Sequence, residues 1–332
     1  MSDQRSGFTV LAGPGDHPDL EHWHGNIGEP IALDLGTPLV RKVTVLDVVT
    51  WNVGIGLGRL SEVVEKIRAG VFDGEKRPAS RPLIILVQEA YRADASVPDA
   101  LKAGFTGGKQ PTGVRSDIVD AATALGFSLR YAPSMRNGRH RSDRGNAVLS
   151  SVAVAHARAF SLPHVRQRRV AVAVELHGLP WLTLVSAHLD TRGRERDTRA
   201  TGRYASGRTA QAGALAQRFA NEWGDDQTVV LGADLNTYFA TREPLLHALG
   251  AAGFERVPHE PRRSHTFHAP PIRMLLDHIM IRAPSPTIAS VRVLRLDEDA
   301  RDRRRYIFGS DHHPLLARIE IAAPGRLTRI IS

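Results

Sequence analysis

Short apolar runs rich in β-branched residues recur along the chain from residue 43 onwards, and polar or turn-forming residues separate them. Runs of this length and composition predict strands that are buried on both faces. Their close spacing between residues 128 and 188 favours hairpin connections, and therefore an antiparallel or mixed sheet. The expected strands are residues 43–53, 82–89, 128–131, 146–150, 152–160, 170–176, 181–188, 228–235, 274–282, 288–296 and 315–321.

Four other segments carry apolar residues at helical spacing. In the first of them, Leu60, Val63 and Ile67 fall on one helical face. So many strands with so few helices imply two β-sheets that pack together and are covered by helices. The expected helices are residues 57–69, 117–125, 205–223 and 243–251.

Residues 1–40 show no clear period and are rich in glycine and proline, which predicts an irregular N-terminal extension. The extension holds six acidic residues against one arginine, a net charge of −5. Because the whole chain carries +9, the remainder carries +14. The extension could fold over the basic body of the protein, or it could be a loosely packed tail.

The composition narrows the chemistry. The chain has no cysteine, which excludes disulfides, thiolate catalysis and cysteine-based zinc sites. Of its 44 basic residues only five are lysine, and the arginine excess could reflect either codon usage or bidentate phosphate binding. There is no run of eighteen apolar residues and no basic segment followed by an apolar one at the N-terminus, so we expect a cytoplasmic protein without a membrane span.

Several of the expected strands end in polar residues that can bind metal or transfer protons. These ends are Trp51-Asn52, Gln88-Glu89, 188–190, 234–236 and 310–313, and Asp277-His278 interrupts a further apolar strand. Each could have a structural role alone, such as an ion pair for Glu89 or a buried hydrogen bond for Asp277. Together they predict one site of oxygen and imidazole ligands, which favours Mg²⁺ or Mn²⁺, with Ca²⁺ also compatible. A hard ion with nearby acids and histidines is what phosphate-ester hydrolysis requires.

These segments resemble the endonuclease/exonuclease/phosphatase superfamily, whose best-known fold is that of deoxyribonuclease I. The resemblance spans residues 43–321 in the family's order, and GADLN with GSDHHPL is its most specific part. It implies an α+β fold, a four-layer α/β/β/α sandwich of two packed mixed β-sheets flanked by helices. The implied organisation is an acidic extension at 1–40, one catalytic domain at 41–323 and a C-terminal tail at 324–332. The matching segments are VTWN, LVQEA, RGNAVLS, SAHLD, LGADLNT, HTF, LLDHIMI and GSDHHPL.

The resemblance also implies roles for the metal-binding side of the site. Glu89 would be the principal metal ligand, with Asn52 and Asp311 beside it. Asp234 and Asn236 would orient the attacking water or the phosphate, or would hold a second ion.

Histidines would provide the remaining chemistry. His312 would contact the scissile phosphate or act as a base, and Asp277 would fix its tautomer and orientation. His188 would be a general acid or a phosphate contact, as in the deoxyribonuclease and sphingomyelinase-like branches. Asp190 could brace His188 or could be only a loop acid. His278 stands where a tyrosine is frequent, at a position that packs rather than reacts.

Basic clusters in the loops suggest the substrate. They are Arg136–Arg144, Arg166–Arg169, Arg192–Arg208 and Arg301–Arg305, and they could follow a nucleic-acid backbone or could form local pairs with acids. The further candidate phosphate contacts are Arg144, Asn146, Asp190, Arg192 and Arg273.

Three functions follow from these patterns. We expect a metal-dependent nuclease with little sequence preference, acting as a monomer. The alternative is a related enzyme for phospholipid head groups, phosphoinositides or small phosphate esters, although no exposed hydrophobic loop for membrane docking is visible in the sequence. A non-catalytic phosphate- or DNA-binding protein is the third, and the complete set of site residues argues against it.

Overall fold

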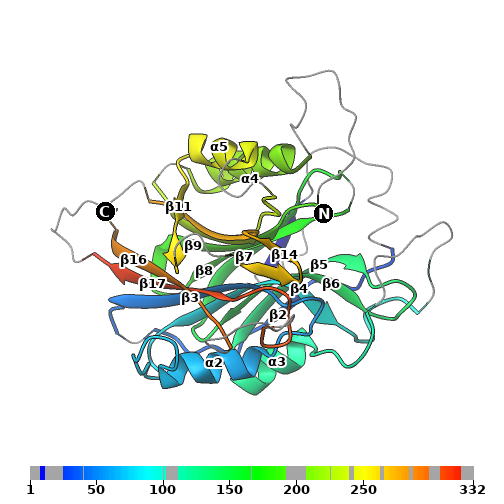
Figure 1. Ribbon diagram of the computed structural model, residues 1–332, viewed down its shortest axis with the longest axis horizontal. Coiled ribbons are helices and arrows are strands. Elements are labelled where there is room, and N and C mark those ends of the chain that lie inside the picture. The colour runs from blue at the N-terminus through cyan, green and yellow to red at the C-terminus, as the bar shows by residue number, and fades with distance from the viewer. Residues whose placement is uncertain are drawn as a thin grey trace.

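The computed structural model places two large sheets face to face, with helices on the outer side of each (Figure 1). Helices α4 and α5 cover one sheet, and α2 and α3 cover the other. The expected four-layer sandwich of two mixed sheets is confirmed. The structure describes residues 8–11, 25–39, 41–99, 101, 111–165, 167–191, 207–224, 226–238, 243–261, 265–283, 287–298 and 307–322.

The first sheet has seven strands and the second has eight. In spatial order the first contains β1 (Phe8–Leu11), β7 (Val154–Ser161), β8 (Val170–Leu176), β9 (Leu179–His188), β10 (Thr228–Asp234), β15 (Asp277–Arg282) and β11 (Glu255–Val257). The second contains β12 (His259–Glu260), β16 (Ile288–Arg295), β17 (Leu315–Ile321), β3 (Val45–Asn52), β4 (Leu83–Arg92), β6 (Asp143–Ser150), β5 (Ser128–Arg136) and β2 (Ile31–Leu33).

The helices are α2 (Leu60–Ala69), α3 (Ile118–Leu125), α4 (Gly207–Trp223) and α5 (Pro244–Ala251), close to the four that the apolar spacing predicts. Asp117 caps α3, where its side chain accepts a hydrogen bond from the Val119 amide at 2.8 Å. Every helix in the described ranges is too short or too polar to cross a membrane.

Two sequence predictions need correction. The extension at 1–40 was expected to be irregular, but its residues 8–11 and 31–33 form edge strands β1 and β2, one in each sheet. The segment 274–282 was expected to be one strand, but it divides into β14 (Ile272–Met274), which pairs with β13 (Phe267–Ala269), and β15. Asp277 therefore begins a strand instead of interrupting one.

The arrangement of parallel strands decides where the polar strand ends lie. β3 is parallel to β4, and β9 is parallel to β10, so the carboxyl ends within each pair point the same way. The register places Asn52 beside Gln88 in one sheet and His188 beside Asp234 in the other. Antiparallel β15 adds Asp277 directly opposite Asp234. One end of the sandwich therefore collects the polar strand ends that the sequence singles out.

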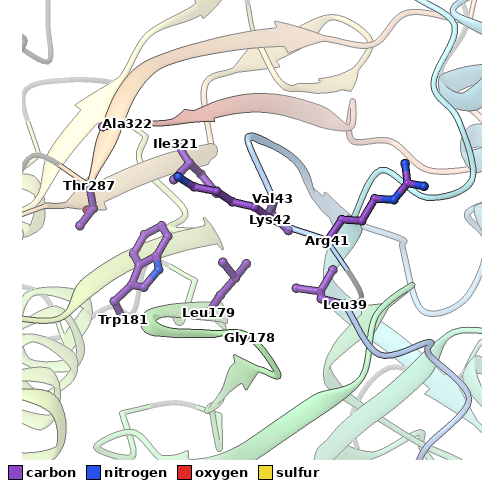
Figure 2. A pocket seen from close by; sticks show the side chains of 10 residues that line it. All are labelled: Leu39, Arg41, Lys42, Val43, Gly178, Leu179, Trp181, Thr287, Ile321 and Ala322. Carbon is purple, nitrogen blue, oxygen red and sulfur yellow. The ribbon is translucent and has the colours of Figure 1, made fainter. Parts of the chain in front are cut away.

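The other end of the sandwich contains a separate cavity of about 440 Å³ (Figure 2). Its walls come from the start of β9, the end of β17 and the segment that leads into β3, and include Trp181, Ile321 and Val43. The described residues that line it include none of the predicted site residues.

The two sheets approach closely near the polar end. A Cβ atom added to Gly232 in β10 would lie 2.7 Å from both Leu86 Cδ1 and Thr50 Cβ in the opposite sheet. At the same level, the fully buried Gln88 side chain donates hydrogen bonds to Gly232 O at 3.2 Å and to Ser186 Oγ at 3.1 Å. Glycine is therefore required here for contact between the sheets rather than for a turn.

We predict that Gly232→Ala destabilises the fold by about 1–3 kcal/mol, because the added methyl group has no space between the sheets. Gly213→Ala in helix α4 is the matched control, since an added Cβ meets nothing within 4 Å there and alanine favours a helix. Urea denaturation of both variants measures the difference. If Gly232→Ala proved as stable as Gly213→Ala, the steric argument would be wrong.

Candidate active site

A pocket of about 460 Å³ opens at the polar end of the sandwich, between the two sheets. Residues from both sheets line it, together with the loops at 54–57 and 111–115. The predicted site residues among its lining are Asn52, Glu89, Arg144, His188, Asp234, Asn236, Asp311 and His312.

A buried carboxylate and an imidazole pair at the wall of this pocket. Asp277 Oδ2 lies 2.8 Å from His312 Nδ1, and Asp277 is fully buried. The backbone around the pair is fixed, because Trp51 Nε1 donates to His312 O at 2.8 Å and the ring of Phe267 packs edge-on, 5.0 Å from the imidazole. The arrangement leaves His312 Nε2 as the imidazole atom available for chemistry, as the resemblance implies.

Carboxylates determine the charge of His312. Burial alone lowers the pKa of the imidazole, but Asp277, Asp234 and Asp311 outweigh that effect and raise the pKa to about 10. Burial and the carboxylate of Asp277 likewise raise the pKa of Asp234 above its ordinary value. Without a bound ion or substrate, the site therefore concentrates negative charge around one protonated imidazole.

Asp234 joins the two sheets across the pocket. Its Oδ2 accepts a hydrogen bond from Asn52 Nδ2 at 2.9 Å and lies 3.3 Å from His188 Nε2. Its Oδ1 accepts the amide of Asn236 at 3.0 Å, and Asn236 Nδ2 lies 3.2 Å from the same His188 nitrogen. Burial, followed by the positive charge of Arg169, holds the pKa of His188 well below its usual range, so His188 is neutral in this environment.

Three pocket residues have a backbone conformation that is unusual for residues other than glycine. Ile55 has φ of +56°, Glu89 has φ of +53° beside a bulge in β4, and Asn236 has φ of +52°. The bulge shifts the pairing between Val87 and Ala90 and leaves Glu89 half-buried at the pocket wall. Such conformations cost free energy and are kept where the surrounding structure fixes them, frequently at functional sites.

The donor atoms of the pocket fit a hard divalent cation. Within the described chain, the Glu89 carboxylate makes no hydrogen bond or ion pair, and that of Asp311 makes only an ion pair with His312 at 4.0 Å. Asn52 Oδ1 accepts one amide, from Gly54 at 3.0 Å, and keeps a second lone pair. Asp234, Asp277 and His312 form a second group, whose possible ligand atoms all lie within 4.8 Å of one another. Oxygen donors of this kind suit Mg²⁺ or Mn²⁺.

The candidate phosphate contacts lie in different environments. Arg144 is buried and lines the pocket, next to Asn137 Oδ1 at 3.4 Å. Asp190 is fully buried and accepts the amides of Gln167 and Thr191, each at 2.9 Å, so it connects two loops. Neither of these two hydrogen bonds of Asp190 involves His188.

The remaining candidates lie away from the pocket or are not described. Asn146 is buried and donates to Val170 O at 2.7 Å, between the sheets. Arg273 is exposed on strand β14 and is not among the described residues that line the pocket. Arg192 lies outside the described residues, as does the cluster at 301–305 and most of that at 192–208.

Other residues contribute to the site without a clear sequence signal. Arg115, Gln167, Arg169 and Met274 also line the pocket. Arg169 belongs to a basic cluster that is visible in the sequence. Its place in the pocket follows from its position directly before strand β8, which the residue pattern does not fix. His278 has a structural role, since its Nε2 lies 2.7 Å from Thr237 Oγ1 and burial lowers its pKa to about 3.

Comparisons with known proteins agree on the fold. A model described as the Endonuclease/Exonuclease/phosphatase family matches residues 49–312. A search of curated proteins finds no match. An endonuclease/exonuclease/phosphatase family protein from Leptotrichia buccalis C-1013-b has a similar structure, with a TM-score of 0.54, 14% identity, and coverage of 83% of this chain and 99% of that chain.

Two further solved structures resemble the chain to the same degree. The catalytic domain of human Nocturnin with bound sulfate has a TM-score of 0.52 and 16% identity, and the match covers 89% of this chain and 97% of that chain. A mannosyl-6-phosphatase from Bacteroides thetaiotaomicron VPI-5482 has a TM-score of 0.52 and 12% identity, with coverage of 84% and 100%. At such identities the likeness shows the fold alone.

We predict that Asp277→Asn lowers the pKa of His312 well below its wild-type value of about 10, because the charge and the hydrogen bond of Asp277 are the largest influences that raise it. The raised pKa stabilises the wild-type fold fully below pH 6.5, and this contribution is lost as the pH rises towards 10. Imidazole ¹⁵N chemical shifts, recorded against pH on metal-free protein, measure the change.

Asp297→Asn is the matched control, since Asp297 Oδ1 lies 2.8 Å from Nδ1 of the neighbouring His313. That variant should leave the titration of His312 near its wild-type position. A His312 pKa that stays near 10 in Asp277→Asn would contradict the assignment of Asp277 as the main source of the shift.

Proposed function

Because the chain belongs to the endonuclease/exonuclease/phosphatase family, we propose that it is a divalent-metal-dependent phosphodiesterase and that nucleic acid is its substrate. One observation carries this proposal. The Asp277–His312 pair and the buried Asp234 face a pocket in which the Glu89 and Asp311 carboxylates have no hydrogen-bond partner among the described residues. That combination supplies a cation site beside a positioned imidazole, which phosphate-ester hydrolysis needs.

We assign the metal to Glu89, with Asn52 and Asp311 as the neighbouring ligands. Asp277 and His312 also lie close enough together to hold an ion, but they already bond to each other at 2.8 Å. When bound there, a Mg²⁺ or Mn²⁺ ion, or the less well suited Ca²⁺, would neutralise phosphate charge and favour loss of a proton from water. The partial exposure of Glu89 and Asp311 supports this assignment, because it leaves their oxygens accessible from the pocket.

The protein's own groups would then position the reactants. His312 would donate a hydrogen bond through Nε2 to a phosphate oxygen, with Asp277 holding the ring through Nδ1. Asp234 would accept a hydrogen bond from the attacking water, and Asn236 would donate one to it. His188, which is neutral and within 3.3 Å of Asp234, would contact the phosphate through a hydrogen bond.

Charge supports nucleic acid as the substrate. The chain carries a formal charge of +9, and Arg115, Arg144 and Arg169 line the pocket. A positive protein attracts a polyanion over long range, and contacts to phosphate rather than to bases give little sequence preference. Part of the arginine excess is structural, since Arg136 and Arg141 donate to backbone carbonyls of residues 95–98.

A second candidate substrate is a phospholipid head group or another small phosphate ester. Two apolar residues favour it. Val114 is 95% exposed and precedes Arg115, which lines the pocket. Ile272 is 52% exposed and lies two residues before Met274, which also lines the pocket. Exposed apolar side chains near a site can contact a lipid surface.

We predict that Mg²⁺ or Mn²⁺ supports hydrolysis of bis-p-nitrophenyl phosphate and that EDTA abolishes it. His312→Ala should lower kcat/KM by roughly 10²- to 10⁴-fold, as loss of an acid–base group does. Glu89→Ala should lower it by about 100-fold or more, through loss of the metal. Release of p-nitrophenolate measures all three effects.

The control variants are His156→Ala on strand β7 and Glu65→Ala on helix α2, both exposed and outside the pocket. Both should retain wild-type kinetics. Full activity in EDTA, or an unchanged rate in Glu89→Ala with folding intact, would refute metal-dependent catalysis at this site.

We also predict that the protein nicks supercoiled plasmid DNA and that the rate falls steeply as salt is raised, because backbone phosphates release counterions on binding. Single-stranded DNA, RNA, a sugar phosphate and sphingomyelin–phosphatidylcholine vesicles are assayed in parallel. Val114→Ser with Ile272→Ser should leave DNA cleavage unchanged. Hydrolysis of the vesicle lipid alone, lost in that double variant, would establish the second candidate instead.

A further inference from the structure

Arg169 is a buried cation for which the described residues supply few partners. It immediately precedes strand β8, is 5% exposed, and lines the catalytic pocket. Within the described residues its guanidinium makes no hydrogen bond and only one ion pair, from Nη2 to Asp190 Oδ1 at 4.0 Å. That carboxylate oxygen already accepts the amide of Thr191 at 2.9 Å.

Other buried arginines of the chain are better compensated. The adjacent Arg168, 3% exposed, donates to Pro133 O at 2.7 Å and to Ser161 Oγ at 3.2 Å. Arg92 and Arg77 each bond to buried carboxylates, Asp143 and Asp47. A buried guanidinium without such bonds is costly, so the few bonds of Arg169 among the described residues leave it able to bind an anion that enters the pocket.

The charges around Arg169 indicate what kind of partner would fit. Burial lowers the pKa of the guanidinium, and the carboxylates of Asp190, Glu89 and Asp234 partly offset that effect. Glu89 and Asp234 thus act on Arg169 through space, without an ion pair to either among the described contacts. An anion beside Arg169 would accept hydrogen bonds from the guanidinium. A cation held by Glu89 and Asp234 would neutralise carboxylates that would otherwise repel that anion.

We propose that the Arg169 guanidinium binds the nonbridging oxygens of the phosphate group that the pocket admits. Its planar fork can donate two parallel hydrogen bonds to a phosphate, which a lysine cannot reproduce. Arg169 is therefore a substrate contact, whereas Arg168 is structural. This inference rests on the proposed phosphoesterase function, and it adds a residue that sets affinity for the phosphate in either substrate class.

Binding of inorganic phosphate tests the proposal without requiring turnover. Isothermal titration calorimetry in the presence of Mg²⁺ compares wild type, Arg169→Met and Arg169→Lys. Loss of charged hydrogen bonds should weaken phosphate binding by roughly 10- to 100-fold in Arg169→Met. Arg169→Lys should recover only part of the affinity, because the ammonium group lacks the fork.

Arg168→Lys is the burial-matched control, and it should bind phosphate as wild type does even where its melting temperature falls. Arg158→Lys, on β7 and away from the pocket, controls for charge at a partly exposed position. Circular dichroism melting of each variant separates folding from binding. Phosphate affinity within about twofold of wild type in a folded Arg169→Met would overturn the proposal, as would no phosphate binding by wild type at millimolar concentration.

Turnover and chemical rescue extend the same test. With bis-p-nitrophenyl phosphate, Arg169→Ala should raise KM and lower kcat, and added methylguanidinium should restore part of the rate. No such rescue should occur in Arg168→Ala. Wild-type turnover with unchanged kinetics in Arg169→Met would refute the role of Arg169 but leave the phosphoesterase function standing. If phosphate binding depended on Arg169 but the wild type hydrolysed no substrate, the role of Arg169 would stand and the phosphoesterase function would be refuted.

Discussion

The close contact between the two sheets at their central parallel strands is the constraint on which the site depends. Gly232 allows β10 to approach Thr50 and Leu86, and Gln88 fills the remaining space with hydrogen bonds rather than with an apolar side chain. One layer further along the strands, the same proximity brings Asn52 within 2.9 Å of Asp234. A larger residue at position 232 would separate the sheets and lengthen the bonds that cross the pocket.

Each sheet contributes a different part of the chemistry. The first sheet places His188, Asp234 and Asp277 on adjacent strands in one line, as the register of β9, β10 and β15 requires. The second sheet supplies Asn52, Glu89 and the segment that precedes β17. Neither sheet alone holds a complete set, and the Asp277–His312 bond crosses from one to the other. Site geometry is therefore coupled to the packing between the sheets and to their stability.

The sequence predicts those features that follow from strand periodicity. Asn52, His188 and Asp234 each end an apolar run, and parallel strands must bring such ends together. Features that depend on tertiary packing could not be predicted in this way. The bulge at Glu89 and the break before Asp277 leave no mark in the pattern of apolar and polar residues. The edge strands β1 and β2 are short segments without a clear period, so the pattern does not predict their pairing either.

The burial of Arg169 belongs to the same group of unpredicted features, and under the proposed function it would explain why the pocket binds a metal with a phosphate better than either alone. Burial and the carboxylate of Asp277 raise the pKa of Asp234, and the half-buried Glu89 adds a further carboxylate to the pocket, while Arg169 lies nearby with one long ion pair. If Arg169 paired directly with Glu89, both charges would be satisfied and neither would attract a ligand. Because Arg169 and Glu89 are not paired with each other, Glu89 can still attract a cation and Arg169 can still attract an anion in the same pocket. A divalent ion and a phosphate bound together would compensate both charges at once.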